Sequence, residues 1–259
     1  MTGSVGRTFL ALLGRDVWVT IRHDAIAFLA QALLQPIFFL FICGRVLPSI
    51  GAAQGGYGTA LLPGVLALTL VLTSLQATAL PLVIEFSFTK EIEDRLLSPA
   101  PVWVVGVEKI LFASLRGIIA ALCILPLGQL ILPGGIDLGG ASWLGFLAIL
   151  LAGAIAGSSV GLLLGTAVPP NRINIAFTVI LTPLLFTGAT FYPWTLLDNL
   201  RWFQVVTLLN PLTYVSEGTC GALSPIPHLA TGWVALGLVA SVVLFGVLGL
   251  LGFERRAVD

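Results

Sequence analysis

Residues suited to chemistry are few in this chain, and most of them lie in one short segment. Residues 86–101 read FSFTKEIEDRLLSPAP and hold five charged side chains within six positions: Lys90, Glu91, Glu93, Asp94 and Arg95. Clustered acids are what general acid–base chemistry needs. Outside this segment the acidic residues are dispersed, so an enzymatic function has little support.

The cysteine and histidine residues predict no metal or haem site. Cys43, Cys123 and Cys220 are scattered without metal-ligand spacing, and the only histidines, His23 and His228, are far apart. Cys43 and Cys123 lie in apolar runs, where cysteine behaves as a small hydrophobic residue. We therefore expect no cofactor in this chain.

The sequence of a phosphate-binding loop is also missing. Such a loop reads G-x-x-x-x-G-K-[ST], because its backbone amides surround the phosphates and its lysine lies beside them. The only lysines are Lys90 and Lys109, and neither follows a glycine-rich loop. We therefore expect that this chain hydrolyses no ATP.

The overall composition is typical of an integral membrane protein. Of the 259 residues, 58% are hydrophobic and 9% are charged, whereas soluble domains carry about 25% charged residues. Too little polar material remains to cover a soluble protein. The net charge of +0 and the lack of Lys and Arg clusters exclude nucleic acid as a partner.

The apolar runs predict an all-α fold with six transmembrane helices. A spanning helix needs about 20 mainly apolar residues. Six such runs occur, at residues 25–46, 60–84, 102–132, 142–168, 173–190 and 229–253. Residues 1–24 mix charged and apolar side chains, which predicts an amphipathic helix at the membrane surface.

The segment at 191–223 includes a stretch, residues 202–223, that is apolar enough to resemble a further span, but Asn210-Pro211 interrupts it. Proline inside a helix removes a hydrogen bond and clashes with the preceding turn. We interpret these residues as an outer segment that forms a re-entrant hairpin of two short helices.

Basic residues predict the orientation, because cytoplasmic loops carry an excess of Lys and Arg. With six spans, eight of these residues lie on one side: Arg7, Arg15, Arg22, Lys90, Arg95, Arg172, Arg255 and Arg256. Both termini are then cytoplasmic. A seventh span would move Arg255 and Arg256 to the outside.

This topology places residues 86–101 in a cytoplasmic connection between the second and third spans. Thr89 can cap a short helix there, and Ile92 and Leu96 fall on one face of it, with Leu97 beside them. Such a helix could press into a groove on a soluble partner. The alternative is a solvated loop whose charges only mark the inner side.

Three stretches carry a resemblance to a known family. They are YGTALLPGVLA at 57–67, EIEDRLLSPAPVWVVGVEKIL at 91–111 and LLFTGATFYPWTLLDNLRWFQVVTLLNPLTYVSEG at 184–218. In order and spacing they resemble the ABC type-2 exporter permeases, the membrane subunits of bacterial drug, glycan and lipid exporters. The resemblance covers nearly the whole chain. One departure is Asp94-Arg95, where the family often has Gly and Thr.

The resemblance implies a half-transporter in the bacterial plasma (inner) membrane, paired with a second permease subunit and two soluble ABC ATPase subunits. ATP and magnesium would then bind the ATPase subunits. Residues 86–101 would hold the coupling helix that docks on them, through Glu91, Ile92, Glu93, Asp94, Arg95, Leu96 and Leu97.

Polar residues inside the spans are candidates for a substrate path. Arg116 lies within the third span, and a charge in the membrane is a functional candidate by default. Its alternatives are to reach the lipid headgroups or to pair with Glu85. We expect Lys109, on the same helix face, together with Gln76 and Phe191, to complete this path.

The fourth span has Gly153, Gly157, Gly161 and Gly165 at intervals of four. Small residues at this spacing form a stripe that allows close approach of another helix. The stripe serves either packing within the bundle or a sliding surface used in transport.

Taken together, these features predict the permease subunit of an ATP-driven exporter. Its apolar walls and compact loops favour an amphipathic drug or lipid-like substrate, taken from the cytoplasm or the inner leaflet. Export of a lipid-linked polysaccharide is the alternative substrate. A scaffold or channel subunit without ATP coupling is the alternative class.

Overall fold

The computed structural model describes residues 2–51, 57–89, 101–132, 140–224 and 227–258, and every regular element in these ranges is helical. Five helical stretches there are long and apolar enough to cross a membrane: Ala25–Ser49, Leu61–Ser87, Val102–Ile131, Trp143–Ala167 and Thr231–Ala257. They match five of the six predicted spans. The fold class of an all-helical membrane protein is therefore confirmed.

The fifth predicted span is shorter than expected. Helix α8, Ile173–Thr187, has 15 residues, which at 1.5 Å per residue gives about 22 Å. This is less than the ~30 Å hydrocarbon thickness of a bilayer. The helix ends before residue 190 because the chain turns at Gly188 and Ala189, whose φ is 50°. The described residues thus hold five candidate spans and one shorter apolar helix.

Two helices form the centre of the bundle, α4 (Tyr57–Ile84) and α7 (Trp143–Ala167), which pack along each other. Around them lie α2 (Ala25–Phe41), α6 (Val102–Ile131), α10 (Pro211–Leu223) and α11 (Thr231–Val258). Every residue of α4 from 61 to 71 is buried. An apolar surface all round suits such a central helix.

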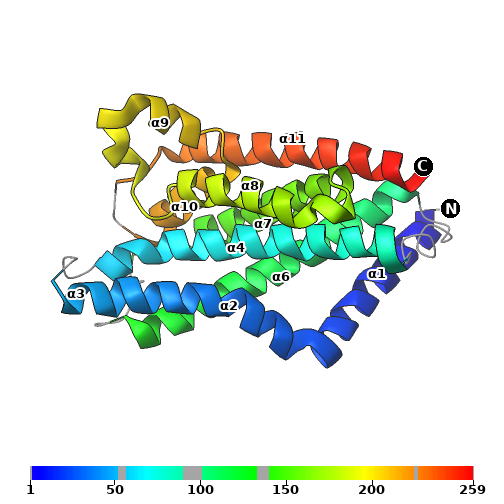
Figure 1. Ribbon diagram of the computed structural model, residues 1–259, viewed down its shortest axis with the longest axis horizontal. Coiled ribbons are helices and arrows are strands. Elements are labelled where there is room, and N and C mark those ends of the chain that lie inside the picture. Colours follow the sequence, from blue (N-terminus) through cyan, green and yellow to red (C-terminus); the bar gives the residue numbers. More distant parts are fainter. Residues whose placement is uncertain (1, 52–56, 90–100, 133–139, 225–226, 259) are drawn as a thin grey trace.

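The first residues form α1, Thr2–Val19, which packs against α6. A π-helical turn at Thr20–Asp24 joins it to α2, and the two helices meet at an angle (Figure 1). A π-helical insertion is a common cause of such a bend. A second π-helical turn, Ile42–Val46, leads from α2 into the short α3, Leu47–Ser49.

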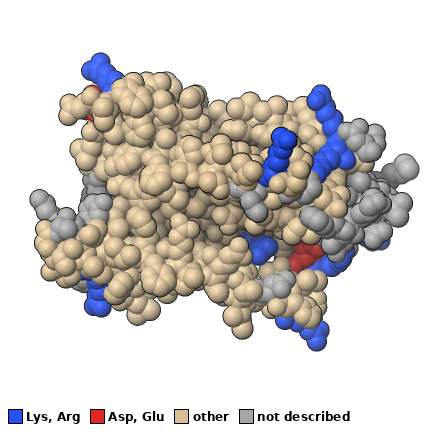
Figure 2. Space-filling view, viewed as in Figure 1, with Lys and Arg blue, Asp and Glu red and all other residues tan. Residues whose placement is uncertain are grey.

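Both ends of the chain lie at the same end of the bundle (Figure 1). Figure 2 shows Lys and Arg side chains gathered mainly at that end, with a broad uncharged belt beside them.

The segment at 191–223 is broken where the sequence predicted. A 3-10 helix at Trp194–Leu200 leads into α9, Arg201–Thr207, and α10 begins at Pro211. Asn210 is the N-cap of α10, and its side chain accepts a hydrogen bond from the Leu212 N–H. Proline at the first helical position needs no partner for an N–H.

Candidate transport path and the elements that position it

The Asn-Pro-Leu-Thr-Tyr stretch ties three helices together. The Asn210 amide donates to the Leu184 carbonyl oxygen at 2.7 Å and to the Thr187 hydroxyl at 2.9 Å, both on α8. The Thr213 hydroxyl donates to the Thr207 carbonyl at 2.6 Å, and the Tyr214 hydroxyl to Leu208 at 2.7 Å. These bonds hold α8, α9 and α10 in one unit.

Glu217, one turn beyond Thr213 on α10, adds further bonds to the same unit. This residue is 2% exposed. One carboxylate oxygen accepts the Trp194 N–H at 2.9 Å, and the other accepts the Leu229 N–H at 2.7 Å. Burial raises the pKa of Glu217, while these two donors and His228 act to lower it. The carboxylate therefore joins the start of the 3-10 helix to the chain just before α11.

Cys220 lies one turn beyond Glu217, and the two line a common cavity of about 60 Å³. Burial, and then the charge of Glu217, raise the pKa of the Cys220 thiol to about 11. The thiol is thus protonated at neutral pH. Because the thiolate is the nucleophile, Cys220 is not an activated cysteine.

The glycine stripe of α7 faces mainly α4 in this structure. A Cβ atom at Gly157 would lie 2.9 Å from the Val71 carbonyl oxygen, and one at Gly161 would clash with the Leu75 carbonyl. At Gly165 the close atoms belong to Leu82 and Ala79, also on α4, whereas Gly153 faces Val215 as well as α4. Close approach of two backbones at such a stripe is typical of membrane helices.

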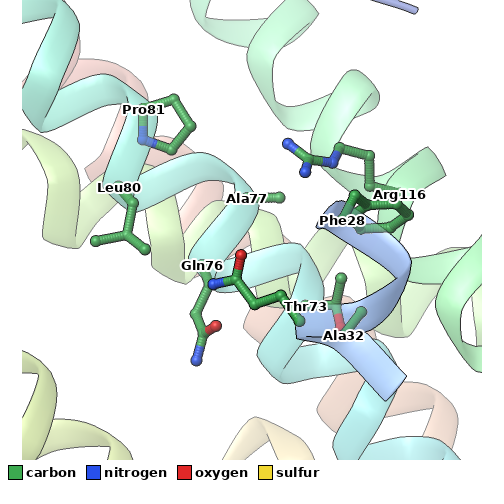
Figure 3. A pocket seen from close by; sticks show the side chains of 9 residues that line it. Phe28, Ala32, Thr73, Gln76, Ala77, Leu80, Pro81 and Arg116 are labelled. Atoms are coloured by element: carbon green, nitrogen blue, oxygen red, sulfur yellow. The ribbon is translucent and has the colours of Figure 1, made fainter. Parts of the chain in front are cut away.

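A cavity of about 140 Å³ opens between α2, α4 and α6 (Figure 3). Its wall combines amide and hydroxyl groups with apolar side chains and one guanidinium. The lining residues are Phe28, Gln31, Ala32, Thr73, Gln76, Ala77, Leu80, Pro81 and Arg116. Two of the expected path residues, Gln76 and Arg116, thus line one cavity.

A second cavity of about 100 Å³ adjoins the first and shares Gln31, Ala32, Thr73 and Gln76 with it. It runs along α2 and α4 towards Phe191, whose ring lies 4.8 Å from that of Phe39. The two cavities therefore form a track along α2 that joins three expected path residues, Arg116, Gln76 and Phe191.

Lys109 lies elsewhere. Its side chain is 7% exposed, and its ammonium donates to the Glu85 carboxylate at 2.5 Å. The Asp16 carboxylate of α1 lies 3.8 Å away. Lys109 is absent from the lining of both cavities along α2. Glu85, which sequence reasoning offered as one possible partner of Arg116, binds Lys109, since α6 packs its first turns against the end of α4.

Arg256 connects the end of α11 to the residues that lead into the charged segment. Its guanidinium donates to the Gly165 and Thr166 carbonyls at 2.8 and 3.0 Å, which satisfies the C-terminal end of α7. It also lies 4.9 Å from the Phe86 ring centre. The start of residues 86–101 is thus fixed to two helix ends.

The expected coupling residues 91–97 lie outside the described part of the chain. The described residues contain no group of three or more His, Cys, Asp or Glu that could hold a metal ion.

Residues 7–223 match the ABC-2 type transporter family. The chain belongs to this family and is a membrane permease, a transport subunit rather than an ATPase. Permeases of this family work with ABC ATPase subunits. The resemblance inferred from the three sequence stretches is thereby confirmed.

Curated relatives agree with this membership. The chain is 26% identical to the inner membrane transport permease YadH of Escherichia coli (strain K12) over 241 residues, 90% of this chain and 88% of the relative. The same permease of Shigella flexneri matches over the same lengths. Together with the five candidate spans, this similarity describes a multi-pass membrane protein.

Sequence reasoning missed several residues of the track. Phe28 and Thr73 were not singled out. A signal for Thr73 was present, because Thr73 and Gln76 are three apart on α4, and Gln31 and Gln35 are likewise four apart on α2. Such spacings place polar groups on one helix face. The contact of Phe28 with Arg116 has no local sequence signal, because it joins α2 to α6.

Proposed function

We propose that the chain is the membrane-spanning half of an ATP-driven exporter for an amphipathic drug or lipid-like substrate, taken from the cytoplasm or the inner leaflet. The observation that carries this proposal is the track along α2. Its walls join apolar side chains to the amides of Gln31 and Gln76 and the Arg116 guanidinium. Mostly apolar cavities with a few placed polar groups are typical of sites for such ligands.

The proposal treats residues 1–259 as one transmembrane domain with six spans, α8 being the fifth. Both termini are placed in the cytoplasm, with residues 1–24 at the interface and 191–223 as the outer re-entrant segment. The gathering of basic side chains at the end where both termini lie supports this orientation (Figure 2). A second permease subunit, identical or different, would complete the path.

Residues 91–97 are proposed to dock on a soluble ATPase. The apolar contact would come from Ile92, Leu96 and Leu97, and the neighbouring charges would set register and partner choice. The location of Phe86 supports this, since its ring lies 5.7 Å from that of Phe253, near the C-terminal end of α11. A rigid support there would let force from the ATPase reach the bundle.

The test is co-purification of the permease with its ABC ATPase subunit. The double variant Ile92→Asp/Leu96→Asp should insert in membranes normally but retain no ATPase, because two charges would replace the apolar contact. Ile50→Asp is the control, since the exposed Ile50 follows α3, at the end of the bundle away from both termini (Figure 1), and should leave binding unchanged. Undiminished co-purification of the double variant would refute the coupling role.

The substrate class is tested with the reconstituted permease and ATPase. We expect amphipathic drugs or lipids to raise the rate of ATP hydrolysis. A rate that rises only with a lipid-linked polysaccharide would replace the proposed substrate by the alternative one.

A further inference from the structure

Two cavities of different chemistry meet at Arg116. The first is the one shown in Figure 3, where Gln31, Thr73 and Gln76 contribute polar groups. The other is also about 140 Å³ and lies between α1, α2 and α6. Apart from Thr20 and Arg116, all its lining residues are apolar: Val17, Ile21, Ala25, Phe28, Leu29, Phe112, Leu115 and Ile119.

Arg116 and Phe28 line both cavities and form the boundary between them. The guanidinium carbon lies 4.4 Å from the centre of the Phe28 ring and 5.8 Å from that of Phe112. A guanidinium over an aromatic face is held by the ring quadrupole. The charge is therefore positioned at the junction by two rings.

The depth of this junction is set by α2. Phe28 lies one turn into α2, and the chain just before that helix carries Arg22 and Asp24. The guanidinium is thus level with the point where the first span leaves charged residues and becomes apolar. In the orientation proposed above, this change from charged to apolar residues marks the inner interface of the membrane, where lipid headgroups lie.

We propose that this junction is a binding site for an anionic, phosphate-bearing lipid. The phosphate binds at Arg116 on the side of Gln31, Thr73 and Gln76, and an acyl chain fills the apolar cavity. Arginine suits this ligand, because its planar fork matches phosphate with two parallel hydrogen bonds. The inference deepens the proposed function by naming a substrate class, and it rests on the orientation given there.

A lipid fits better than free phosphate because the two cavities adjoin. Inorganic phosphate would contact the polar side alone and leave the apolar cavity without a ligand group. A lipid carries a phosphate and an acyl chain in one molecule. These two groups match the polar and the apolar cavity that lie on either side of Arg116 and Phe28.

The experiment measures lipid retention on the purified full chain without an ATPase. The protein is mixed with equal amounts of phosphatidylglycerol and phosphatidylcholine of identical acyl chains, and retained lipid is counted by native mass spectrometry. Wild type should prefer phosphatidylglycerol. Arg116→Gln should lower this preference about tenfold, as expected for loss of a charged hydrogen bond. Arg116→Lys, which keeps the charge but not the fork, should be intermediate.

Two further variants complete the test, one as a control and one as a second perturbation of the site. Arg201→Gln removes an exposed arginine of the outer segment and should retain the wild-type preference. Ala77→Leu narrows the first cavity without changing any charge, so it should reduce phosphatidylglycerol retention. If Arg116→Gln does not fold, Arg116→Lys and Ala77→Leu decide the matter, and wild-type retention by both would overturn the proposal.

Other outcomes also refute it. Equal retention of the two lipids by wild type, or equal losses in Arg116→Gln and Arg201→Gln, would exclude a site at Arg116. Displacement of the lipid by inorganic phosphate would assign the site to the free ion. Because no ATPase is present, this experiment measures binding alone. If the lipid is retained here but does not stimulate the reconstituted permease and ATPase, the inference stands and the proposed export is refuted.

Discussion

A methyl group at Gly161 should destabilise the protein more than one at any other position of the α7 stripe. The Cβ atom of Gly161→Ala would meet the backbone carbonyl of Leu75, with the Thr78 Cβ atom at 2.9 Å and the Leu75 Cα at 3.0 Å. Leu75 lies in the buried centre of α4, so its carbonyl cannot rotate away as a side chain would. The helices α4 and α7 would have to separate.

The size of the effect follows from two opposing terms. Overpacking of a core lowers stability by about 1 to 3 kcal/mol. We expect Gly161→Ala near the upper end of this range, because the new methyl group meets a backbone carbonyl that cannot move aside. Alanine regains up to about 1 kcal/mol of helix propensity over glycine. The net loss is about 2 kcal/mol, which lowers the melting temperature by roughly 4 to 8 °C in a chain of this size.

The assay is thermal unfolding of the purified permease in detergent. Gly246→Ala on α11 is the matched control, because its Cβ atom would meet only the Ser159 hydroxyl, at 3.6 Å. It should unfold at or slightly above the wild-type temperature. Gly165→Ala should fall between, since the Leu82 side chain at 2.9 Å can shift. A Gly161→Ala variant as stable as the control would refute close packing of α4 on α7.

Two further predictions concern buried carboxylates. Lys109→Met should lower the free energy of unfolding by about 3 to 5 kcal/mol, because it leaves the 8% exposed Glu85 without its ammonium partner. Adding Glu85→Gln should recover part of that stability. No recovery would show that loss of the ion pair is not the cause. Glu217→Ala should lower the free energy of unfolding by about 2 kcal/mol, because the N–H groups of Trp194 and Leu229 lose their acceptor. Thr195→Ala is the control: it removes one 3.5 Å hydrogen bond and should leave the stability nearly unchanged. Since the folded pKa of Glu217 is raised above 4.5, its contribution to stability is greatest below that pH and is lost as the pH rises through the folded pKa; unfolding measured against pH should show this step in wild type and not in Glu217→Ala.

The sequence predicted the helices well because their signals are local. Apolar runs of 20 residues or more, ended by glycine or proline, correspond to the long helices within a few residues. Asn210-Pro211 marked the break between α9 and α10, since proline cannot continue a helix interior. The end of α8 was misplaced because Ala189 adopts a positive φ that its residue type does not announce.

The sequence alone determined the membrane class, the family resemblance and the number of apolar runs, because these depend on composition, order and spacing along the chain. Only the tertiary structure decided which partners the buried charges have. Lys109 binds a carboxylate 24 residues away, Arg116 lies over a ring of another helix, and Arg256 caps α7 from 91 residues away. These pairings depend on how the helices pack against one another. Packing brings together residues that are far apart in the sequence, and no spacing pattern along the chain predicts which residues will meet.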